Sequence, residues 1–402
     1  MNIFQKTYYR LFQKAMYLGA FFISFKEPKL IKGKGSIVDT IEVAKKHGYK
    51  SIFVVSSEQL EQFGLLDEYK EALAKSGIPH KFFLDVLVDP NIDLVEKGLK
   101  EYQEMDKACI VAIGGGSVID CAKVIAARST NKKSIRKMKG LFKITHKLPL
   151  LMVAPTTAGT GSETTLAAVI VDSENHDKYA INDPHLIPKY AVLDPNFLLT
   201  LPGSVTSTTG MDALTHAIEA YIGKSNICKT KRNALSAIKL IFENLEASYN
   251  EPKNIEYREN MQLASYQAGV AFTRAYVGYV HALAHSLGGK YKVPHGLANA
   301  LLLPEVLKEF GSSIDKKMAE IYDYVYGKTT KLSNNEKKIF IINKIEEMNR
   351  NMNIVSNLKD TIKLDDIDEL VNHAYKESHP LYPVPKFLSK EILKNIYIKL
   401  MH

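Results

Sequence analysis

The first half of the chain alternates short apolar runs with segments in which apolar residues recur every three or four positions. The apolar runs, several of them rich in β-branched residues, predict strands over 51–57, 81–86, 108–116, 148–157 and 165–171. Between several of these runs, the spacing of apolar residues predicts amphipathic helices, such as those over 58–77 and 93–105. This alternation indicates βαβ units and a mostly parallel sheet.

The pattern changes after the stretch DPNFLLTLP at 194–202. From about residue 203 to residue 402 nearly every segment follows a helical period, with Gly, Pro and Asn at the breaks. The change of period near 197–202 therefore predicts two domains that share a cleft. We expect an α/β domain over 30–199 and an all-helical domain over 200–402, preceded by an N-terminal extension over 1–29.

The N-terminal extension carries basic residues followed by an apolar run, which is faintly like a signal peptide. No A-x-A site follows the run, however, and its apolar residues recur at helical spacing: Phe4, Tyr8, Leu11, Phe12, Ala15 and Leu18. We expect an amphipathic helix that docks on the body of the protein or on a partner subunit. Weak attachment to a membrane surface is the alternative.

Composition narrows the class of protein. A chain of 402 residues with 46% hydrophobic and 24% charged residues fits a two-domain globular protein, and it has no apolar run long enough to span a bilayer. Cys109, Cys121 and Cys228 form no CxxC pair, which is typical of a cytoplasmic protein. The net charge is +9, and residues 131–147 hold seven Lys and Arg, but no nucleic-acid-binding motif accompanies them. We expect a solvated basic loop there and no nucleic-acid partner.

Two loops carry the features of a nucleotide site. In AIGGGSVIDCAK (112–123) a strand ends in three glycines and opens a helix, whose free N–H groups can bind a phosphate. Such turns are also common without a ligand. A second loop rich in hydroxyl donors, PTTAGTGSE (155–163), follows another strand, and together the two loops favour a nucleotide. The turn is not G-x-G-x-x-G and follows two earlier strands, so it departs from the usual Rossmann position.

Acidic and histidine residues at helical spacing indicate a metal site. Asp212 and His216, in GMDALTHAIEAY, lie one helical turn apart, although an Asp–His hydrogen bond on a helix surface would give the same spacing. His281 and His285 repeat that spacing within an apolar helix, and His295 follows. One carboxylate with several imidazoles suits Fe²⁺ or Zn²⁺, with a coordination position open for a substrate oxygen. The spacing leaves open which of the three histidines bind the ion.

The motifs GGGSVIDCAK, PTTAGTGSE, GMDALTHAIEAY and HALAHSLGGKYKVPHGLANA, in this order, resemble those of the iron-containing (group III) alcohol dehydrogenases. The resemblance covers about residues 30 to 400. It implies an α/β dinucleotide-binding domain with a parallel sheet, an all-α C-terminal domain and a metal in the cleft between them, which is a dehydroquinate synthase-like architecture. It also implies hydride transfer between NAD(P)(H) and a small alcohol or aldehyde. We further expect a homodimer.

Carried onto this chain, the resemblance implies a role for each residue that matches a family motif. The metal ligands would be Asp212, His216, His281 and His295. His285 would lie near the nicotinamide without ligating, as a proton relay or positioning group. The residues that match the cofactor loops are Gly114, Gly115, Gly116, Ser117 and Asp120 for the pyrophosphate, and Thr156, Thr157 and Thr160 for the second loop. Lys178 matches a lysine that contacts the nicotinamide ribose.

One position departs from the pattern of many family members that use NAD. Those proteins place an aspartate at the end of the second strand, where it binds the adenine ribose and repels a 2′-phosphate. Here the strand ends IFVVSS, and Ser57 occupies that place. We therefore expect NADP(H) to be favoured over NAD(H), although the neighbouring Glu58 argues the other way. In the segment 271–281, which is expected to line the substrate pocket, we expect Arg274 to face outward rather than to meet an anionic group.

Three other classes of protein compete with the dehydrogenase interpretation. A lyase like dehydroquinate synthase would need a basic, phosphate-binding substrate pocket. A hydroxyacid–oxoacid transhydrogenase would turn over with tightly bound cofactor and no net change in free NAD(P)H. A catalytically inactive scaffold is disfavoured because no expected ligand position is substituted.

Overall fold

The computed structural model describes residues 1–174, 177–328 and 331–402. The chain forms two compact units. The sheet unit comprises Ser24–Thr157 and Gly161–Thr200, and the helical unit comprises Met1–Ile23, Ala158–Thr160 and Leu201–His402.

The sheet unit is built on six parallel strands in the order β1-β9-β6-β4-β2-β3. Their bounds are β1 (Lys29–Lys32), β2 (Ser51–Val55), β3 (His80–Phe83), β4 (Ala108–Gly114), β6 (Leu151–Pro155) and β9 (Tyr190–Leu193). Every residue of β2, β4 and β6 is buried, as expected for central strands covered on both faces, whereas the edge strand β1 is mostly exposed. The predicted parallel sheet is confirmed.

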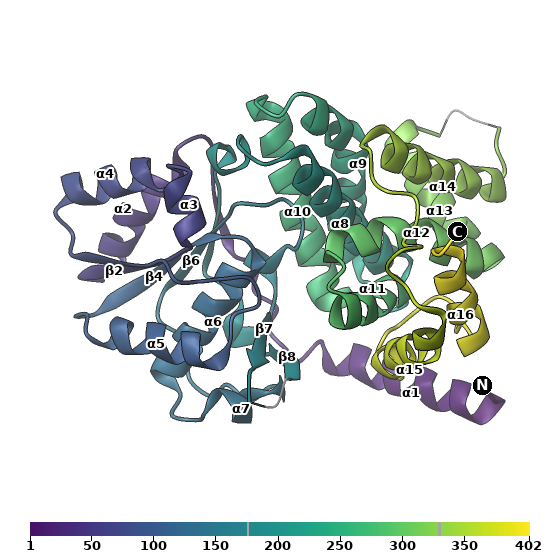
Figure 1. Ribbon diagram of the computed structural model, residues 1–402, viewed down its shortest axis with the longest axis horizontal. Helices are drawn as coiled ribbons and strands as arrows, with labels where there is room; N and C mark the ends of the chain where they lie inside the picture. The colour runs from purple at the N-terminus through teal and green to yellow at the C-terminus, as the bar shows by residue number, and fades with distance from the viewer. Residues whose placement is uncertain (175–176, 329–330) are drawn as a thin grey trace. The chain divides into compact units, whose positions relative to one another are not determined.

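Helices cover both faces of this sheet. Figure 1 shows α2 (Asp39–Lys46), α3 (Glu58–Gln62) and α4 (Asp67–Ser76) on one face, and α5 (Ile92–Gln103) and α6 (Gly116–Thr130) on the other. The helix expected over 58–77 is therefore two helices that are separated around Gly64. On the second face, Val95 of α5 and Val124 of α6 join Phe53 and Phe83 of the sheet in one buried core.

A smaller sheet contains one of the predicted strands. Its order is β5-β8-β7, with β7 and β8 antiparallel, and its strands are β5 (Gly140–Leu141), β7 (Ala167–Asp172) and β8 (Asp177–Asn182). The strand expected over 165–171 thus exists, but it belongs to this sheet rather than to the parallel one. The basic stretch 131–147 includes the short helix α7 (Ile135–Met138) and β5, and its lysine side chains are exposed, as expected.

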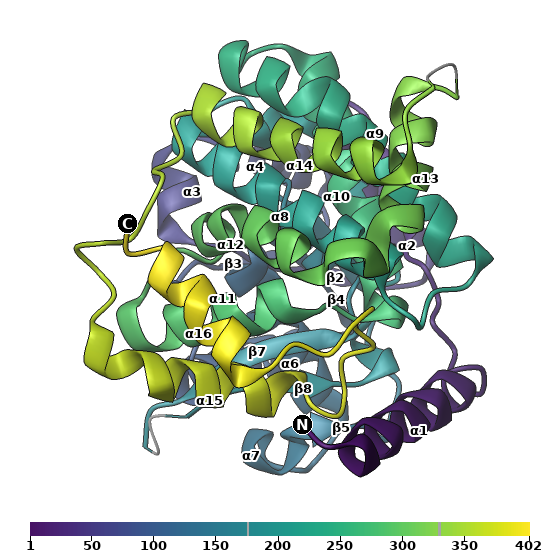
Figure 2. The ribbon, with the colours of Figure 1, turned by 90° about the vertical axis from the view of Figure 1, so that its right-hand side faces the viewer.

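The helical unit is arranged around one central helix, α8. Its helices are α1 (Ile3–Gly19), α8 (Gly203–Ile222), α9 (Cys228–Asn250), α10 (Ile255–Ala275), α11 (Tyr279–Tyr291), α12 (His295–Phe310), α13 (Asp315–Tyr326), α14 (Asn334–Asn351), α15 (Ile367–Ser378) and α16 (Lys390–Lys399). Helices α9, α10 and α12 pack against α8 (Figure 2), which is buried on all sides from residue 210 to residue 222. The predicted all-helical C-terminal part is confirmed.

Short 3₁₀ helices connect these elements, at Ser36–Val38, Ser162–Thr164, Pro184–Leu186, Pro195–Leu198, Gly311–Ile314 and Leu364–Asp366. Within the described residues, no helix has both the length and the apolar composition that crossing a bilayer requires.

The N-terminal helix α1 docks on the helical unit, but not through the stripe from which it was predicted. Of the predicted stripe, Phe12 is half-buried, and the other five residues are exposed: Phe4, Tyr8, Leu11, Ala15 and Leu18. The opposite face, which includes the buried Gln13, makes the polar contacts. Arg274 is also placed differently from our expectation. It is buried, and its guanidinium lies 5.4 Å from the ring centroid of Tyr17 and 4.8 Å from that of Phe21. Arg274 therefore does not face outward, because these aromatic rings cover it.

Candidate functional site

The central helix α8 carries the first two expected metal ligands. Asp212 and His216 lie one turn apart on α8, and both are buried. The ring of His216 stacks on Phe272 of α10, with 4.1 Å between ring centroids and an interplanar angle of 12°. This packing fixes the plane of the imidazole, so its Nδ1 stays 3.8 Å from Asp212 Oδ1.

Two further helices bring the remaining expected ligands to Asp212. His281, on α11, has its Nε2 atom 3.7 Å from Asp212 Oδ1, and His295, the first residue of α12, has its Nε2 atom 3.4 Å from the same oxygen. One ligand atom from each of Asp212, His216, His281 and His295 can be chosen so that all four lie within 4.8 Å of one another. Residues far apart in the sequence thus form one cluster within the helical unit.

The four side chains fit a divalent ion. In a tetrahedral site with bonds of about 2.1 Å, neighbouring ligand atoms lie about 3.4 Å apart, which is close to the three separations from Asp212 Oδ1. Among the described residues, His216 Nδ1 and His281 Nε2 are buried and have no hydrogen-bond partner. Buried polar atoms without partners are rare and costly in proteins. A bound cation would satisfy both nitrogens, and one carboxylate with three imidazoles is a donor set that Fe²⁺ and Zn²⁺ accept.

Glu219, which the sequence analysis did not identify, orients His281. Its carboxylate accepts the Nδ1–H of His281 at 2.7 Å, and it also accepts the backbone N–H groups of Gly278 (2.7 Å) and Val280 (2.8 Å) at the start of α11. The bond to Nδ1 leaves the lone pair on Nε2, the atom that faces Asp212. Glu219 therefore stabilises the N-terminus of α11 and selects the tautomer that can bind a metal.

Electrostatics in the cluster favour a charged Asp212. Burial alone would raise the pKa of this carboxyl group, but the nearby His216, His295 and His281 outweigh burial and hold the pKa well below its usual range. Burial lowers the pKa of His216 well below its usual range. Burial would also lower the pKa of His281, but its contacts with Asp212 and Glu219 raise that pKa to about 9.

Close packing of α12 on α8 sets the position of His295. A Cβ atom on Gly296 would lie 2.3 Å from the backbone oxygen of Thr208 on α8, so only glycine allows the two helices to approach this closely. One turn further along α12, Asn299 Nδ2 donates to Asp212 Oδ1 at 2.7 Å and lies 3.0 Å from His295 Nε2. Gly296 and Asn299 together hold His295 beside Asp212.

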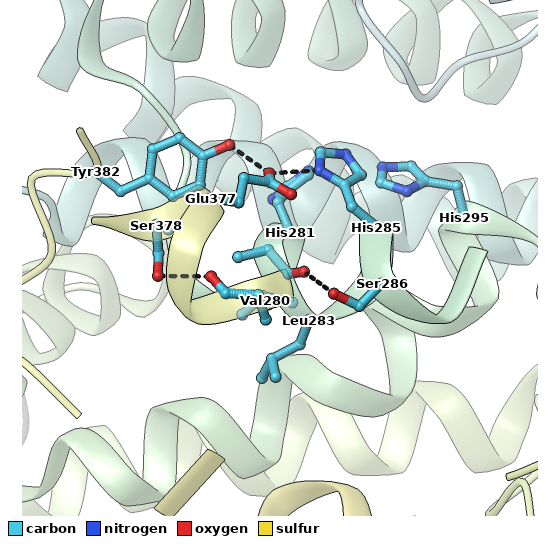
Figure 3. A network of polar contacts seen from close by, with 12 residues as sticks. Val280, His281, Leu283, His285, Ser286, His295, Glu377, Ser378 and Tyr382 are labelled. Carbon is cyan, nitrogen blue, oxygen red and sulfur yellow. Dashed lines mark hydrogen bonds and ion pairs between the residues drawn. The ribbon is translucent and has the colours of Figure 1, made fainter. Parts of the chain in front are cut away.

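The third histidine of the sequence motif, His285, has different surroundings. It lies one turn after His281 on α11, and its ring stacks on His295 with centroids 5.1 Å apart. Its Nδ1 is 2.7 Å from Glu377 Oε1, and the hydroxyl of Tyr382 donates to the same oxygen at 2.7 Å (Figure 3). The side chain of His285 is 46% exposed, whereas that of His281 is 2% exposed.

Glu377 is held in its charged form by these two partners. Burial would raise its pKa, but His285 and the Tyr382 hydroxyl outweigh burial and lower it. The carboxylate therefore accepts a hydrogen bond from His285 Nδ1–H, which leaves the lone pair on Nε2. His285 is thus fixed in one tautomer by a carboxylate, as His281 is, but at a position that solvent reaches.

Sequence reasoning could have found some of the missed residues but not others. Glu219 lies seven residues after Asp212 on α8, and Asn299 lies four residues after His295 on α12, so helical spacing places both on the face that carries the ligands. Glu377 and Tyr382 lie more than ninety residues after His285 and follow no motif. Only the folded chain brings them together.

In the sheet unit, the two predicted cofactor loops are neighbours. Strands β4 and β6 pair in parallel, with Gly114 opposite Pro155, and the N–H of Thr156 donates to the carbonyl of Gly114 at 3.1 Å. A Cβ atom on Gly114 would lie 2.5 Å from Val118, so glycine is required where α6 meets the strand. Within the described residues, no side chain caps α6 at Gly115. The first backbone N–H groups of α6 can therefore donate hydrogen bonds to an anion.

Three predicted cofactor residues make internal contacts in this unit. Asp120 is half-buried, and its carboxylate accepts the hydroxyl of Ser162 (2.8 Å) and the backbone N–H of Val169 (2.9 Å), so it ties α6 to the second loop. Lys178 forms an ion pair with Asp89 at 2.6 Å, and the N–H of Asp89 donates to the Ser117 hydroxyl at 3.4 Å. Ser117 and Lys178, which are far apart in the sequence, therefore meet at Asp89.

The remaining predicted residues divide between the units. Thr157 belongs to the sheet unit, and its side chain lies 4.0 Å from the position that a Cβ atom on Gly115 would occupy. Thr160 belongs to the helical unit. Ser57 follows β2 and precedes α3 without capping that helix through its side chain, and its backbone pairs with that of Asp85. Lys97 lies 3.0 Å from the Asp85 carboxylate, so the negative charge beside Ser57 is shared with a cation.

Comparison with known proteins places this architecture in one enzyme family. The sequence profile of iron-containing alcohol dehydrogenases matches residues 27–195, and the profile of the C-terminal part of the Fe-containing alcohol dehydrogenase family matches residues 206–401. The chain is 36% identical to alcohol dehydrogenase 4 of Schizosaccharomyces pombe over 92% of this chain and 87% of that protein. It is 32% identical to the NAD-dependent methanol dehydrogenase of Bacillus methanolicus over 88% of this chain and 93% of that protein.

A solved structure shows the same similarity in three dimensions. The crystal structure of a 1,3-propanediol oxidoreductase superposes with a TM-score of 0.89 and 32% identity, and covers 94% of this chain and 100% of that chain. The fold and the sequence matches together define an alcohol dehydrogenase-type oxidoreductase that acts on alcohols or aldehydes with a nicotinamide cofactor. The chain belongs to the iron-containing alcohol dehydrogenase family.

The close approach at Gly296 gives a first prediction. Gly296→Ala should force α12 away from α8 and move His295 away from Asp212, so we expect the protein to retain at least tenfold less Fe²⁺ or Zn²⁺ at a fixed free concentration. Gly289→Ala is the matched control, because nothing lies within 4 Å of its added Cβ. Metal content after equilibrium dialysis measures the effect. Equal metal retention by the two variants would show that the contact between Gly296 and Thr208 does not determine the metal affinity.

A second prediction separates the three histidines. His281→Ala and His295→Ala should each abolish metal retention, because each removes one of four donors. His285→Ala should keep the metal, because Nδ1 of His285 is engaged with Glu377 and the residue lies outside the cluster of four. Elemental analysis of the three purified variants measures their metal content and so tests which histidines bind the ion. Metal loss in all three would refute this division of roles.

Proposed function

We propose that this protein transfers a hydride between NAD(P)(H) and a small alcohol or aldehyde in a metal-dependent reaction. The observation that carries the proposal is the cluster of Asp212, His216, His281 and His295, which contains buried nitrogen atoms without hydrogen-bond partners. An alcohol dehydrogenase-type enzyme needs a means of polarising the substrate oxygen, and this cluster has the donor set for a Lewis acid.

The four clustered side chains would hold the divalent ion, Fe²⁺ or Zn²⁺. Such an ion, when bound, supplies Lewis acidity toward the substrate oxygen. Glu219 keeps the Nε2 lone pair of His281 directed at the cluster, and Asn299 holds Asp212 Oδ1. Because these four side chains would already fill a tetrahedral site, a substrate oxygen would have to bind as an additional ligand, and catalytic zinc sites can expand in this way to five ligands.

His285 is suited to move the proton that accompanies hydride transfer. Its Nδ1–H donates to Glu377, so Nε2 carries the lone pair and can accept a proton from an alcohol or return one to an aldehyde. Because the side chain is 46% exposed, it can exchange that proton with water. The neighbouring Glu377 stabilises the protonated ring.

The glycine turn and the second loop of the sheet unit are proposed to bind the cofactor. The N–H groups at the start of α6, from Gly114 through Ser117, would bind the pyrophosphate. The hydroxyl groups of Thr156, Thr157 and Thr160 and the amine of Lys178 would donate to the nucleotide. Asp120 would act through Ser162, which it orients.

Ser57 supports a preference for NADP(H) over NAD(H). Its hydroxyl makes no capping bond to α3 and can donate to a 2′-phosphate, whereas an aspartate at this position would repel one. The nearby Asp85 is paired with Lys97, which reduces its repulsion of the phosphate. The methanol dehydrogenase relative is named for NAD, so the preference would be a property of this chain rather than of the family.

The names of the relatives guide the choice of substrate. Methanol and 1,3-propanediol are small primary alcohols, and we propose substrates of that size. We also propose that the enzyme works as a homodimer in the cytoplasm. The free state of Cys109, Cys121 and Cys228 fits a reducing compartment.

The proposed activity is tested by the oxidation of NADPH or NADH with small aldehydes. Protein stripped of metal should be inactive, and reloading with Fe²⁺ or Zn²⁺ should restore turnover because a bound ion would supply the Lewis acidity that the carbonyl oxygen needs. Absorbance at the reduced-nicotinamide band reports the rate. No turnover with any combination of metal and cofactor would favour a transhydrogenase or a dehydroquinate synthase-like lyase instead.

The cofactor preference is tested by Ser57→Asp. The new carboxylate should raise the KM for NADPH at least tenfold, equivalent to about 1.4 kcal/mol, and should leave the KM for NADH within about twofold of wild type. Glu58→Gln is the control, because it removes an exposed neighbouring charge without altering Ser57. Wild-type preference for NADH would contradict the role of Ser57 and leave the dehydrogenase activity unaffected.

A further inference from the structure

The N-terminal helix α1 lies outside the regions that match the family profiles, yet it contacts the part of the helical unit that supports His285. The profiles begin at residue 27, whereas α1 ends at Gly19. The face of α1 that docks carries Tyr9, Arg10 and Gln13, and all three side chains reach the stretch between α15 and α16. This stretch, residues 379–389, has no regular secondary structure.

Two polar side chains of α1 bind the backbone of residues 380–385. Gln13 Nε2 donates to the carbonyl groups of Pro380 (2.9 Å) and Tyr382 (2.7 Å). The Arg10 guanidinium donates to the carbonyl groups of Val384 (2.8 Å) and Pro385 (3.2 Å), and it also donates to Gln13 Oε1 at 2.8 Å. Carbonyl groups outside helices and strands need such partners when they are buried. The two side chains therefore fix a segment that lacks a hydrogen-bonding ladder of its own.

Aromatic contacts strengthen the same attachment. The Arg10 guanidinium lies 4.0 Å from the centroid of the Phe387 ring, and the ring of Tyr9 packs on His379 with centroids 5.2 Å apart. Gln13 itself is 5% exposed, so its hydrogen bonds are shielded from water. Hydrogen bonds that are removed from water hold their geometry more firmly than exposed ones.

The segment that α1 fixes carries Tyr382, which completes the support of His285. The carbonyl of Tyr382 accepts from Gln13, and its hydroxyl donates to Glu377 Oε1, the oxygen that also contacts His285 Nδ1 (Figure 3). Each of these contacts is 2.7 Å long. A continuous chain of short hydrogen bonds therefore runs from α1 through Tyr382 and Glu377 to His285.

We propose that α1 is a positioning element of the active site, and that Gln13 and Arg10 hold residues 380–385 so that Tyr382 and Glu377 orient His285. The inference rests on the proposed role of His285 in proton transfer. Gln13 touches neither a substrate nor a metal ligand, and it acts through Tyr382. Helix α1 thus contributes to the reaction although it lies before the matched family regions.

The kinetic test compares Gln13→Ala with Lys14→Ala in the full-length, Zn²⁺-loaded enzyme. Lys14 is the exposed neighbour of Gln13 on α1, and its replacement should leave kcat unchanged. Gln13→Ala should lower kcat by about 2- to 30-fold while the metal content and the KM for cofactor stay the same. Arg10→Gln is the second variant, and it should lower kcat in the same way. Equal kcat for Gln13→Ala, Arg10→Gln and Lys14→Ala would overturn the proposal, even if the two docking variants melt at lower temperature.

A double variant tests the route. If Gln13 acts through Tyr382, the double variant Gln13→Ala/Tyr382→Phe should have the kcat of Tyr382→Phe alone. Losses of kcat that multiply would show that α1 acts independently of Tyr382, and would overturn the proposal.

A readout without turnover separates this inference from the proposed function. In ¹⁵N-histidine-labelled, Zn²⁺-loaded protein, the Nδ1 resonance of His285, assigned with His285→Gln, should shift in Gln13→Ala. The resonances of His47, which lies in the sheet unit, should not move. If the wild-type protein is inactive but this shift occurs, the proposed function fails and the positioning by α1 stands. An unmoved His285 resonance would overturn the positioning whatever the activity.

Discussion

The helical unit is organised around a buried negative charge. Asp212 sits on the central helix α8, 3% of its side chain is exposed, and three imidazole rings surround it at 3.4–3.8 Å. A buried carboxylate is costly unless cations or hydrogen bonds balance it. The proposed ligands come from α8, α11 and α12, so the packing of these helices and the binding of an ion would be linked, and a shift of one helix would change the affinity for the ion.

The two histidines of α11 share one local pattern but have different surroundings. His281 and His285 lie one turn apart, and each places Nδ1 2.7 Å from a carboxylate, Glu219 in one case and Glu377 in the other. The difference between them is burial. His281 is enclosed and faces Asp212, whereas His285 is almost half exposed and can exchange protons with water. The carboxylates also differ in origin, because Glu219 belongs to the same helix as two of the ligands and Glu377 is held by a segment that α1 fixes.

Much of the fold and of the candidate site could be predicted from the sequence where the pattern involves residues close together in the chain. Buried strands such as β2 and β4 are continuous apolar runs, and the spacing of Asp212 and His216 follows from helical geometry. Predictions failed where contacts between distant segments determine which face of a helix docks or what surrounds a side chain. The apolar spacing in α1 correctly predicted a helix but not the face that docks, because hydrogen bonds from Gln13 and Arg10 are made from the opposite face. Arg274 is covered by Tyr17 of α1 and by Phe21 beyond it, and Glu377 and Tyr382 belong to no motif, so the surroundings of these residues are set only by the folding of distant segments.

The central claim is that Asp212, His216, His281 and His295 bind one divalent ion and His285 does not. Anomalous diffraction at the iron absorption edge, from crystals of Fe²⁺-loaded protein, tests it most directly. If the four residues bind the ion, we expect a single strong peak within about 2.0–2.3 Å of one donor atom from each of them, with His285 Nδ1 still hydrogen-bonded to Glu377. A peak that His285 coordinates, or a peak away from Asp212, would contradict it.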